Sequence, residues 1–198
     1  PQGYRHARAV VEAMSKPERL GAAEIVPGGR VGVARFPADA QTASELLEAA
    51  QTARMGIPAT GEQVAIFTPE ARAAALRKLA VESGLRHAAE RGELSLSYQL
   101  QADLTTGEIA GAQVIMNWTS QALGSVPGHE FVPIAMQTGL IVMLGDWKRE
   151  AVCQQLRAWE QVGVRMPRLC LRISQLELQQ PDMVDKLRQS LLANGLQA

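Results

Sequence analysis

This sequence has few aromatic residues, only two cysteines and no net charge. Aromatic side chains make up 4% of the 198 residues, which argues against a stacking platform for single-stranded nucleic acid. Twenty acidic residues offset twenty basic ones, so no net charge draws the chain to nucleic acid or to an anionic membrane. We therefore expect no nucleic-acid partner, and any charged ligand must be recognised by local groups.

Long apolar runs and disulfide patterns are also absent. The longest uninterrupted apolar run, 140–144, is far too short to span a bilayer, so we expect no membrane segment in this chain. Cys153 and Cys170 are too few for a disulfide framework and favour the reducing cytoplasm, with both thiols free. The chain shows no signal peptide and starts without Met, as an internal piece of a longer protein would.

What is present is a globular composition, with 46% hydrophobic residues, that can form one sizeable core or two small ones. In the first part of the chain, Thr42 and Glu45 have the spacing of a capping box, which predicts a helix from there to about Gly56. The pattern further predicts a helix over 4–15 and strands over 30–36 and 64–67.

A long helix is predicted to follow, because Thr68 can cap it and Pro69 suits its first position. Gly84 should weaken this helix, and a helical pattern resumes over 85–91. We place a domain boundary within 68–84.

Beyond this boundary the pattern changes to strands. Apolar and polar residues alternate over 94–101, and a second strand over 108–118 should pair with it as a hairpin. The pattern further predicts a loop over 124–128, a short helix to Gln137, a strand over 168–174 and a helix over 181–194. It also predicts a helix over 144–162, with Trp147, Ala151, Leu156 and Trp159 as core candidates.

This order of elements predicts the α/β class, because strands alternate with helices as in a (βα) barrel or a doubly wound sheet. Three strands in the second part cannot close an eight-stranded barrel, so we expect an incomplete one.

Two stretches resemble families of bacterial signalling domains. The segment 31–39 (VGVARFPAD) and the helix after it look like the C-terminal part of a GGDEF domain, although Gln51 stands where that family usually has Asp. The GGDEF motif itself would lie before Pro1, so the resemblance implies no cyclase site here. The later segments similar to an EAL domain are 85–94 (LRHAAERGEL), 131–135 (FVPIA), 138–141 (TGLI) and 144–147 (LGDW).

The combined resemblance implies a GGDEF–EAL tandem protein. It divides the chain into the C-terminal part of a GGDEF-like α/β domain over 1–68, a linker helix over 69–84 and the N-terminal part of an EAL-type (βα) barrel over 85–198. EAL domains bind cyclic di-GMP and, when intact, hydrolyse it to linear pGpG with divalent metal ions.

The resemblance places the family's Glu-Ala-Leu signature on Gln113, Val114 and Ile115. Gln113 thus stands where the family has a metal-binding Glu, and a neutral amide is a weak ligand for a hard cation. Arg172 stands at a metal-binding Asn; a guanidinium has no acceptor and repels a cation. Both residues also have plainer interpretations: Gln113 as a hydrogen bond to a neighbouring strand, and Arg172 as a surface or salt-bridged side chain.

Two further positions bear on ligand binding. Gln99 matches a family glutamine at the edge of the ligand, whereas Asn117 replaces a common Arg that contacts a phosphate. Met136 and Gln137 replace an acidic pair. We therefore predict a tentative cyclic di-GMP site at Gln99, Gln113, Asn117 and Arg172, with no catalytic residue and no metal.

The function that follows is a degenerate EAL-like domain acting as a cyclic di-GMP receptor or as a protein-interaction module, with a protein partner or a homodimer expected. No cofactor is expected. The alternatives are a phosphodiesterase that uses Mg²⁺ or Mn²⁺, and a purely structural or dimerising domain. Asn117 and Arg172 do not decide between the receptor and the structural domain.

Overall fold

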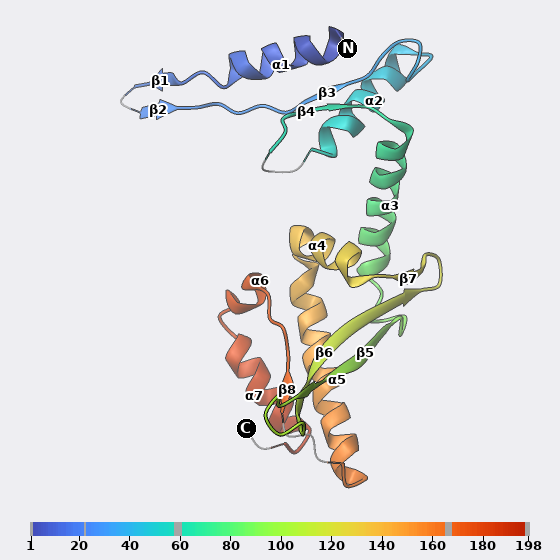
Figure 1. Ribbon diagram of the computed structural model, residues 1–198, viewed down its shortest axis with the longest axis vertical. Helices are drawn as coiled ribbons and strands as arrows, with labels where there is room; N and C mark the ends of the chain where they lie inside the picture. Colours follow the sequence, from blue (N-terminus) through green and yellow to red (C-terminus); the bar gives the residue numbers. More distant parts are fainter. Residues whose placement is uncertain (1, 22, 58–60, 165–167, 197–198) are drawn as a thin grey trace. The chain divides into compact units, whose positions relative to one another are not determined.

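A computed structural model describes residues 2–21, 23–57, 61–164 and 168–196. The chain divides into two compact units, Pro1–Leu79 and Ala80–Ala198 (Figure 1). The division falls inside a single helix, α3 (Pro69–Leu85). Each unit is described by itself below.

The first unit contains two small two-stranded sheets and two further helices. In one sheet, β3 (Val31–Val33) pairs in parallel with β4 (Val64–Ile66), so the strands predicted there exist but are shorter. The other sheet is an unpredicted hairpin of three-residue strands. The remaining elements are α1 (Gln2–Met14), β1 (Glu18–Leu20), β2 (Ala23–Ile25) and α2 (Ala43–Met55).

The predicted capping box begins α2. The Thr42 hydroxyl accepts the Glu45 amide at 3.2 Å, and the Glu45 carboxylate accepts the Thr42 amide at 3.1 Å. Behind this helix, a Cβ on Gly32 of β3 would collide with the backbone oxygen of Ala50. Close helix–strand contact therefore explains the glycine at position 32.

The predicted start of α3 is confirmed, because the Thr68 hydroxyl accepts the amide of Ala71 at 3.1 Å. The helix passes through Gly84 to Leu85. A Cβ at Gly84 would lie 3.1 Å from the Trp118 ring, so the glycine allows close packing. The predicted helical pattern over 85–91 is wrong, since turns follow Leu85.

A four-stranded sheet forms the centre of the second unit. The predicted hairpin is confirmed: β5 (Leu94–Ala102) pairs antiparallel with β6 (Ile109–Ser120). The predicted loop after it contains β7 (Gly124–Val126), which also pairs antiparallel with β6. The predicted third strand shrinks to β8 (Leu169–Cys170), parallel to β6, because only these two residues reach the ladder.

In the described residues of the second unit, the helices that follow are α4 (Gly128–Thr138), α5 (Leu140–Gln161), α6 (Gln175–Leu178) and α7 (Met183–Ala193). Helix α5 begins four residues before its predicted start, directly after Gly139, whose left-handed backbone (φ 75°) ends α4. The helix predicted over 181–194 is α7, whereas α6 was not predicted. Helix α5 contacts α4, α6, α7 and β5 (Figure 1).

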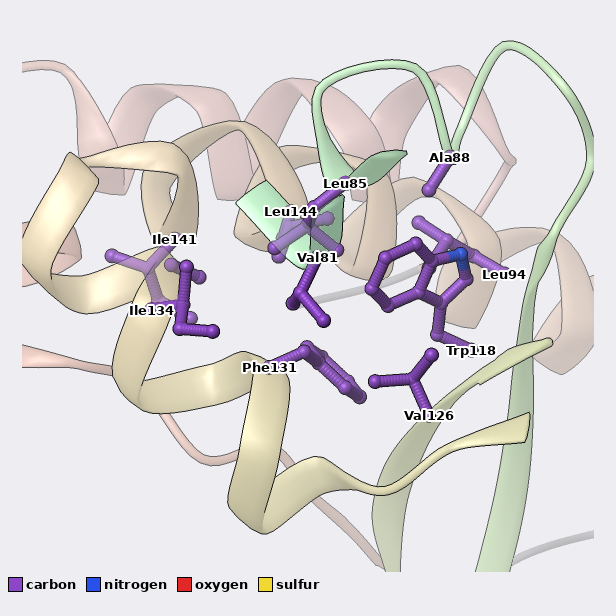
Figure 2. Packing of buried hydrophobic residues seen from close by; sticks show 11 residues of the cluster. Val81, Leu85, Ala88, Leu94, Trp118, Val126, Phe131, Ile134, Ile141 and Leu144 are labelled. Atoms are coloured by element: carbon purple, nitrogen blue, oxygen red, sulfur yellow. The ribbon is translucent and has the colours of Figure 1, made fainter. Parts of the chain in front are cut away.

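The core of this unit lies between the sheet and the helices. Trp118 and Phe131 meet edge to face with ring centroids 5.9 Å apart, and Leu144 is fully buried beside them (Figure 2). The four core candidates predicted in α5 are half-buried; its buried positions are Ile141, Leu144, Gly145, Val152 and Cys153. Both cysteines are free thiols, as predicted.

The predicted α/β class is confirmed, whereas a closed barrel is not seen in the described residues. None of the helices in the described part of the chain has the length and apolar character needed to cross a membrane.

The hydrogen bonds of Glu93 lead to a prediction of how the stability of the fold depends on pH. The Glu93 carboxylate accepts the Trp118 indole N–H at 2.9 Å and the Gln121 amide at 3.1 Å, and these bonds lower its pKa below the usual 4.5. A lowered pKa stabilises the fold above pH 4.5, and this contribution is lost as pH falls through the folded-state pKa. We expect Glu93→Gln to lower the melting temperature at pH 7 and to converge with the native protein in acid.

The measurement is thermal unfolding by circular dichroism from pH 7 to pH 3. Glu108→Gln, in the exposed β5–β6 turn, is the matched control and should follow the native curve. A Glu93→Gln curve parallel to the native one over the whole range contradicts the prediction.

Candidate functional site

The open face of the sheet gathers three of the four predicted site residues. Along β6, Ala112, Val114 and Trp118 point into the core, so the odd-numbered residues between them lie on the opposite face. Gln113 on this face is half-buried and Asn117 is exposed. Gln99 of β5 is the direct ladder partner of Gln113, which puts it on the same face.

Arg172 joins this group from the segment after β8. Cys170 is the ladder partner of Gln113, and Arg172 follows it two residues later. With the Gln113 amide turned so that its oxygen faces the guanidinium, this oxygen accepts Nε of Arg172 at 2.6 Å and Nη2 at 3.2 Å. Both side chains therefore engage each other directly.

Asn117 and Gln99 are placed differently. The Asn117 amide donates to the Ser97 hydroxyl across the hairpin at 2.9 Å. Gln99 is exposed opposite Gln113. The structure thus brings Gln113 and Arg172 into contact, with Gln99 opposite Gln113 on the neighbouring strand and Asn117 further along β6.

A cavity of about 600 Å³ adjoins the Gln113–Arg172 contact. It lies among β6, α4 and the segment that follows β8, and its volume is in the range of small-molecule sites. Arg172 and Lys148 bring positive charge to its lining, and Glu177 is the acidic residue among the described lining residues. Because Glu177 is engaged by Lys148, the Arg172 guanidinium is the charge left to attract an anion.

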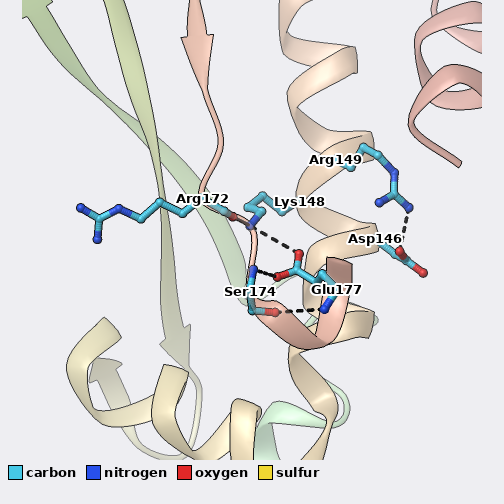
Figure 3. A network of polar contacts seen from close by, with 6 residues as sticks. All are labelled: Asp146, Lys148, Arg149, Arg172, Ser174 and Glu177. Atoms are coloured by element: carbon cyan, nitrogen blue, oxygen red, sulfur yellow. Dashed lines mark hydrogen bonds and ion pairs between the residues drawn. The ribbon is translucent and has the colours of Figure 1, made fainter. Parts of the chain in front are cut away.

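Lys148 and Glu177 form a buried pair beside this cavity (Figure 3). The ammonium lies 3.8 Å from the carboxylate, and the two side chains are only 11% and 10% exposed. Burial lowers the pKa of Lys148 below its ordinary value, and the attraction of Glu177 opposes this effect. The sequence analysis missed both residues, although the spacing of Ser174 and Glu177 is a readable capping-box signal.

These donors do not fit a divalent metal ion. The Gln113 oxygen is already engaged by the guanidinium, and Arg172 has no lone pair to offer. In the part of the chain that the structure describes, no three His, Cys, Asp or Glu side chains come together as a metal site would require.

Comparison with known proteins identifies the family. The model of the EAL domain matches residues 82–198. The chain belongs to the EAL domain family. This confirms the predicted EAL resemblance of the second part of the chain.

Similar proteins extend over more of the chain. It is 29% identical over 192 residues to the bifunctional diguanylate cyclase/cyclic di-GMP phosphodiesterase MucR of Pseudomonas aeruginosa, covering 96% of this chain and 28% of MucR. It is 28% identical over 186 residues to the cyclic di-GMP phosphodiesterase PdeR of Escherichia coli, covering 93% of this chain and 28% of PdeR. The chain thus spans about a quarter of the length of these relatives.

Solved structures share the fold of the EAL domain. The PaMucR phosphodiesterase in complex with cyclic di-GMP matches with a TM-score of 0.55 and 31% identity, covering 59% of this chain and 47% of the other. The Vibrio cholerae LapD segment with S helix, GGDEF and EAL domains matches with a TM-score of 0.50 and 15% identity, covering 78% of this chain and 37% of that one.

Gly145 of α5 generates a stability prediction. A Cβ at this position would collide with the carboxylate of Glu177, which cannot swing away because the Ser174 amide and Lys148 hold it. Alanine gains about 1 kcal/mol in helix propensity, whereas overpacking costs about 1–3 kcal/mol. We expect Gly145→Ala to lower the free energy of unfolding by about 1 kcal/mol net.

Urea denaturation measures this change. Gly128→Ala in α4 is the matched control, because a Cβ there meets nothing within 4 Å and should be tolerated. Equal or greater stability of Gly145→Ala relative to the native protein would show that Glu177 is not held in place.

Proposed function

We propose that this EAL domain binds cyclic di-GMP without hydrolysing it and acts as a receptor or protein-interaction module. The observation that carries the proposal is the contact between Gln113 and Arg172, which occupies two positions where the family resemblance places metal ligands. Loss of both ligands at one site removes the means of activating water with a metal ion.

The same substitutions are compatible with phosphate binding. Arginine forms strong charge-assisted hydrogen bonds to phosphate, and the Nη1 donors of Arg172 are not used by Gln113. The guanidinium of Arg172 would supply the positive charge that a metal ion supplies at the same position in an active relative. Gln99 and Asn117, on the same face of the sheet, would contact the ligand further from the cavity.

The proposal includes a tandem arrangement in a cyclic di-GMP signalling protein of the cytoplasm. Residues 1–68 would be the C-terminal part of a GGDEF-like domain, 69–84 the linker helix and 85–198 the N-terminal part of the EAL domain. In support, the MucR match covers 96% of the chain, well beyond the EAL residues. The LapD match, at 78% of the chain, also exceeds them.

The competing function is a cyclic di-GMP phosphodiesterase that uses Mg²⁺ or Mn²⁺. The names of MucR and PdeR favour it. The chemistry of Gln113 and Arg172 opposes it. A guanidinium has no acceptor and cannot bind a metal ion, whatever residues the rest of the protein contains. A third function is a structural or dimerising domain that binds no nucleotide, with a protein partner or a second copy as its ligand.

One experiment separates these three functions. The intact protein is titrated with cyclic di-GMP by calorimetry, and pGpG formation is then assayed with Mg²⁺ and with Mn²⁺. We expect binding without turnover. Turnover would show that the protein is a phosphodiesterase, and absence of binding would favour the structural or dimerising domain.

Arg172→Ala tests the proposed phosphate contact. A hydrogen bond to a charged group contributes about 1.5–3 kcal/mol, so we expect the affinity for cyclic di-GMP to fall by about 10- to 100-fold. Arg168→Ala, an exposed arginine just before β8, is the charge-matched control and should bind like the native protein. Unchanged affinity of Arg172→Ala would remove the proposed role of this residue.

A further inference from the structure

The backbone that carries Arg172 lacks the support of a sheet. Strand β8 ends at Cys170, and the chain then runs without regular structure until α6 begins at Gln175. A side chain on such a segment is held only as well as its backbone is. The groups that hold residues 172–174 therefore determine where the Arg172 guanidinium lies.

Two buried side chains that also line the cavity hold this segment. Lys148 of α5 donates from its ammonium to the backbone carbonyl of Arg172. Glu177 of α6 accepts the backbone amide of Ser174 at 2.7 Å. These bonds fix the carbonyl of residue 172 and the amide of residue 174, the backbone groups on either side of Ile173.

Lys148 and Glu177 are in turn linked to each other. Their charged groups lie 3.8 Å apart, and Glu177 can sit there because Gly145 has no side chain. Figure 3 shows that the Arg172 side chain extends away from this pair, toward the opposite side of the segment. The pair thus acts on the backbone of Arg172 and leaves its guanidinium to Gln113.

A gain in stability is a poor explanation for this pair. Removing two charges from water costs several kcal/mol per ion, and apolar residues of similar volume often stabilise a protein as well or better. A buried pair does impose one geometry, because any displacement leaves a charge without its partner. This property suits the fixing of a functional side chain.

We propose that Lys148 and Glu177 are positioning residues that hold the 172–174 segment so that Arg172 meets Gln113 and the bound ligand. The proposal rests on the proposed function for its effect on cyclic di-GMP affinity, but its geometric part does not require the nucleotide. It predicts that loss of the pair moves the Arg172 guanidinium off Gln113 and weakens ligand binding through Arg172 alone.

The ligand-free test follows the Nε–H resonance of Arg172 by NMR in the intact protein labelled with ¹⁵N-arginine. Gln113→Ala gives the resonance position without the Gln113 contact. We expect Lys148→Met to shift the Arg172 resonance toward that position. Lys148→Met with Glu177→Gln should do the same, and it avoids the buried unpaired carboxylate that could unfold the single variant.

Lys186→Met is the control, because Lys186 of α7 pairs with Asp146 and Asp182 and makes no contact with Arg172. Its Arg172 resonance should match the native one. A native-like resonance in the folded Lys148→Met, Glu177→Gln variant would overturn the positioning role, whatever the protein binds.

The second readout is a double-mutant cycle of cyclic di-GMP affinity. In the presence of Arg172, removal of the Lys148–Glu177 pair should weaken binding by about tenfold, as is usual for directly coupled residues. In the Arg172→Ala background the same change should have no further effect. An equal loss in both backgrounds would contradict positioning and indicate a general structural role. Absence of binding by the native protein would refute the proposed function, and the NMR shift would still decide the positioning.

Discussion

The second unit depends on the alternation of strand β6 and on its register with its neighbours. This strand pairs with β5, β7 and β8, so it fixes the position of every other strand in the sheet. Its even-numbered residues, from Ala112 to Trp118, face the core, and Gln113 and Asn117 face outward. A slip of one residue would bury the polar set and expose Trp118, which makes the register strongly determined.

The Gln113–Arg172 contact pairs a guanidinium with an amide oxygen that accepts from it. A guanidinium at position 172 would repel a metal ion beside it, and a neutral amide at 113 supplies an acceptor for that guanidinium. Either residue without the other would leave a hydrogen-bonding group without a suitable partner. Together they satisfy each other and keep a positive charge next to the cavity. Gly145, Lys148 and Glu177 extend this arrangement into α5 and α6.

Local patterns in the sequence predicted much of this. The alternation over 94–101 and the turn after it predicted the β5–β6 hairpin, and the caps at Thr42 and Thr68 predicted the starts of α2 and α3. The misses arise from contacts between residues far apart in the chain. The extent of β7 and β8 depends on how much of each reaches β6, and Gly84 is explained only by the Trp118 ring against it. Likewise, nothing near Lys148 in the sequence shows that its ammonium reaches the carbonyl of Arg172.

If Gln113 and Arg172 stand at metal-ligand positions, as we propose, the site built around them holds no divalent metal ion, with or without nucleotide. Electron paramagnetic resonance of Mn²⁺ tests this, because the sharp signal of the free ion is lost when the ion is bound. We expect the intact protein to leave the Mn²⁺ signal unchanged, both alone and with cyclic di-GMP present. Stoichiometric loss of the signal that is abolished by substitution of Gln113 would contradict it.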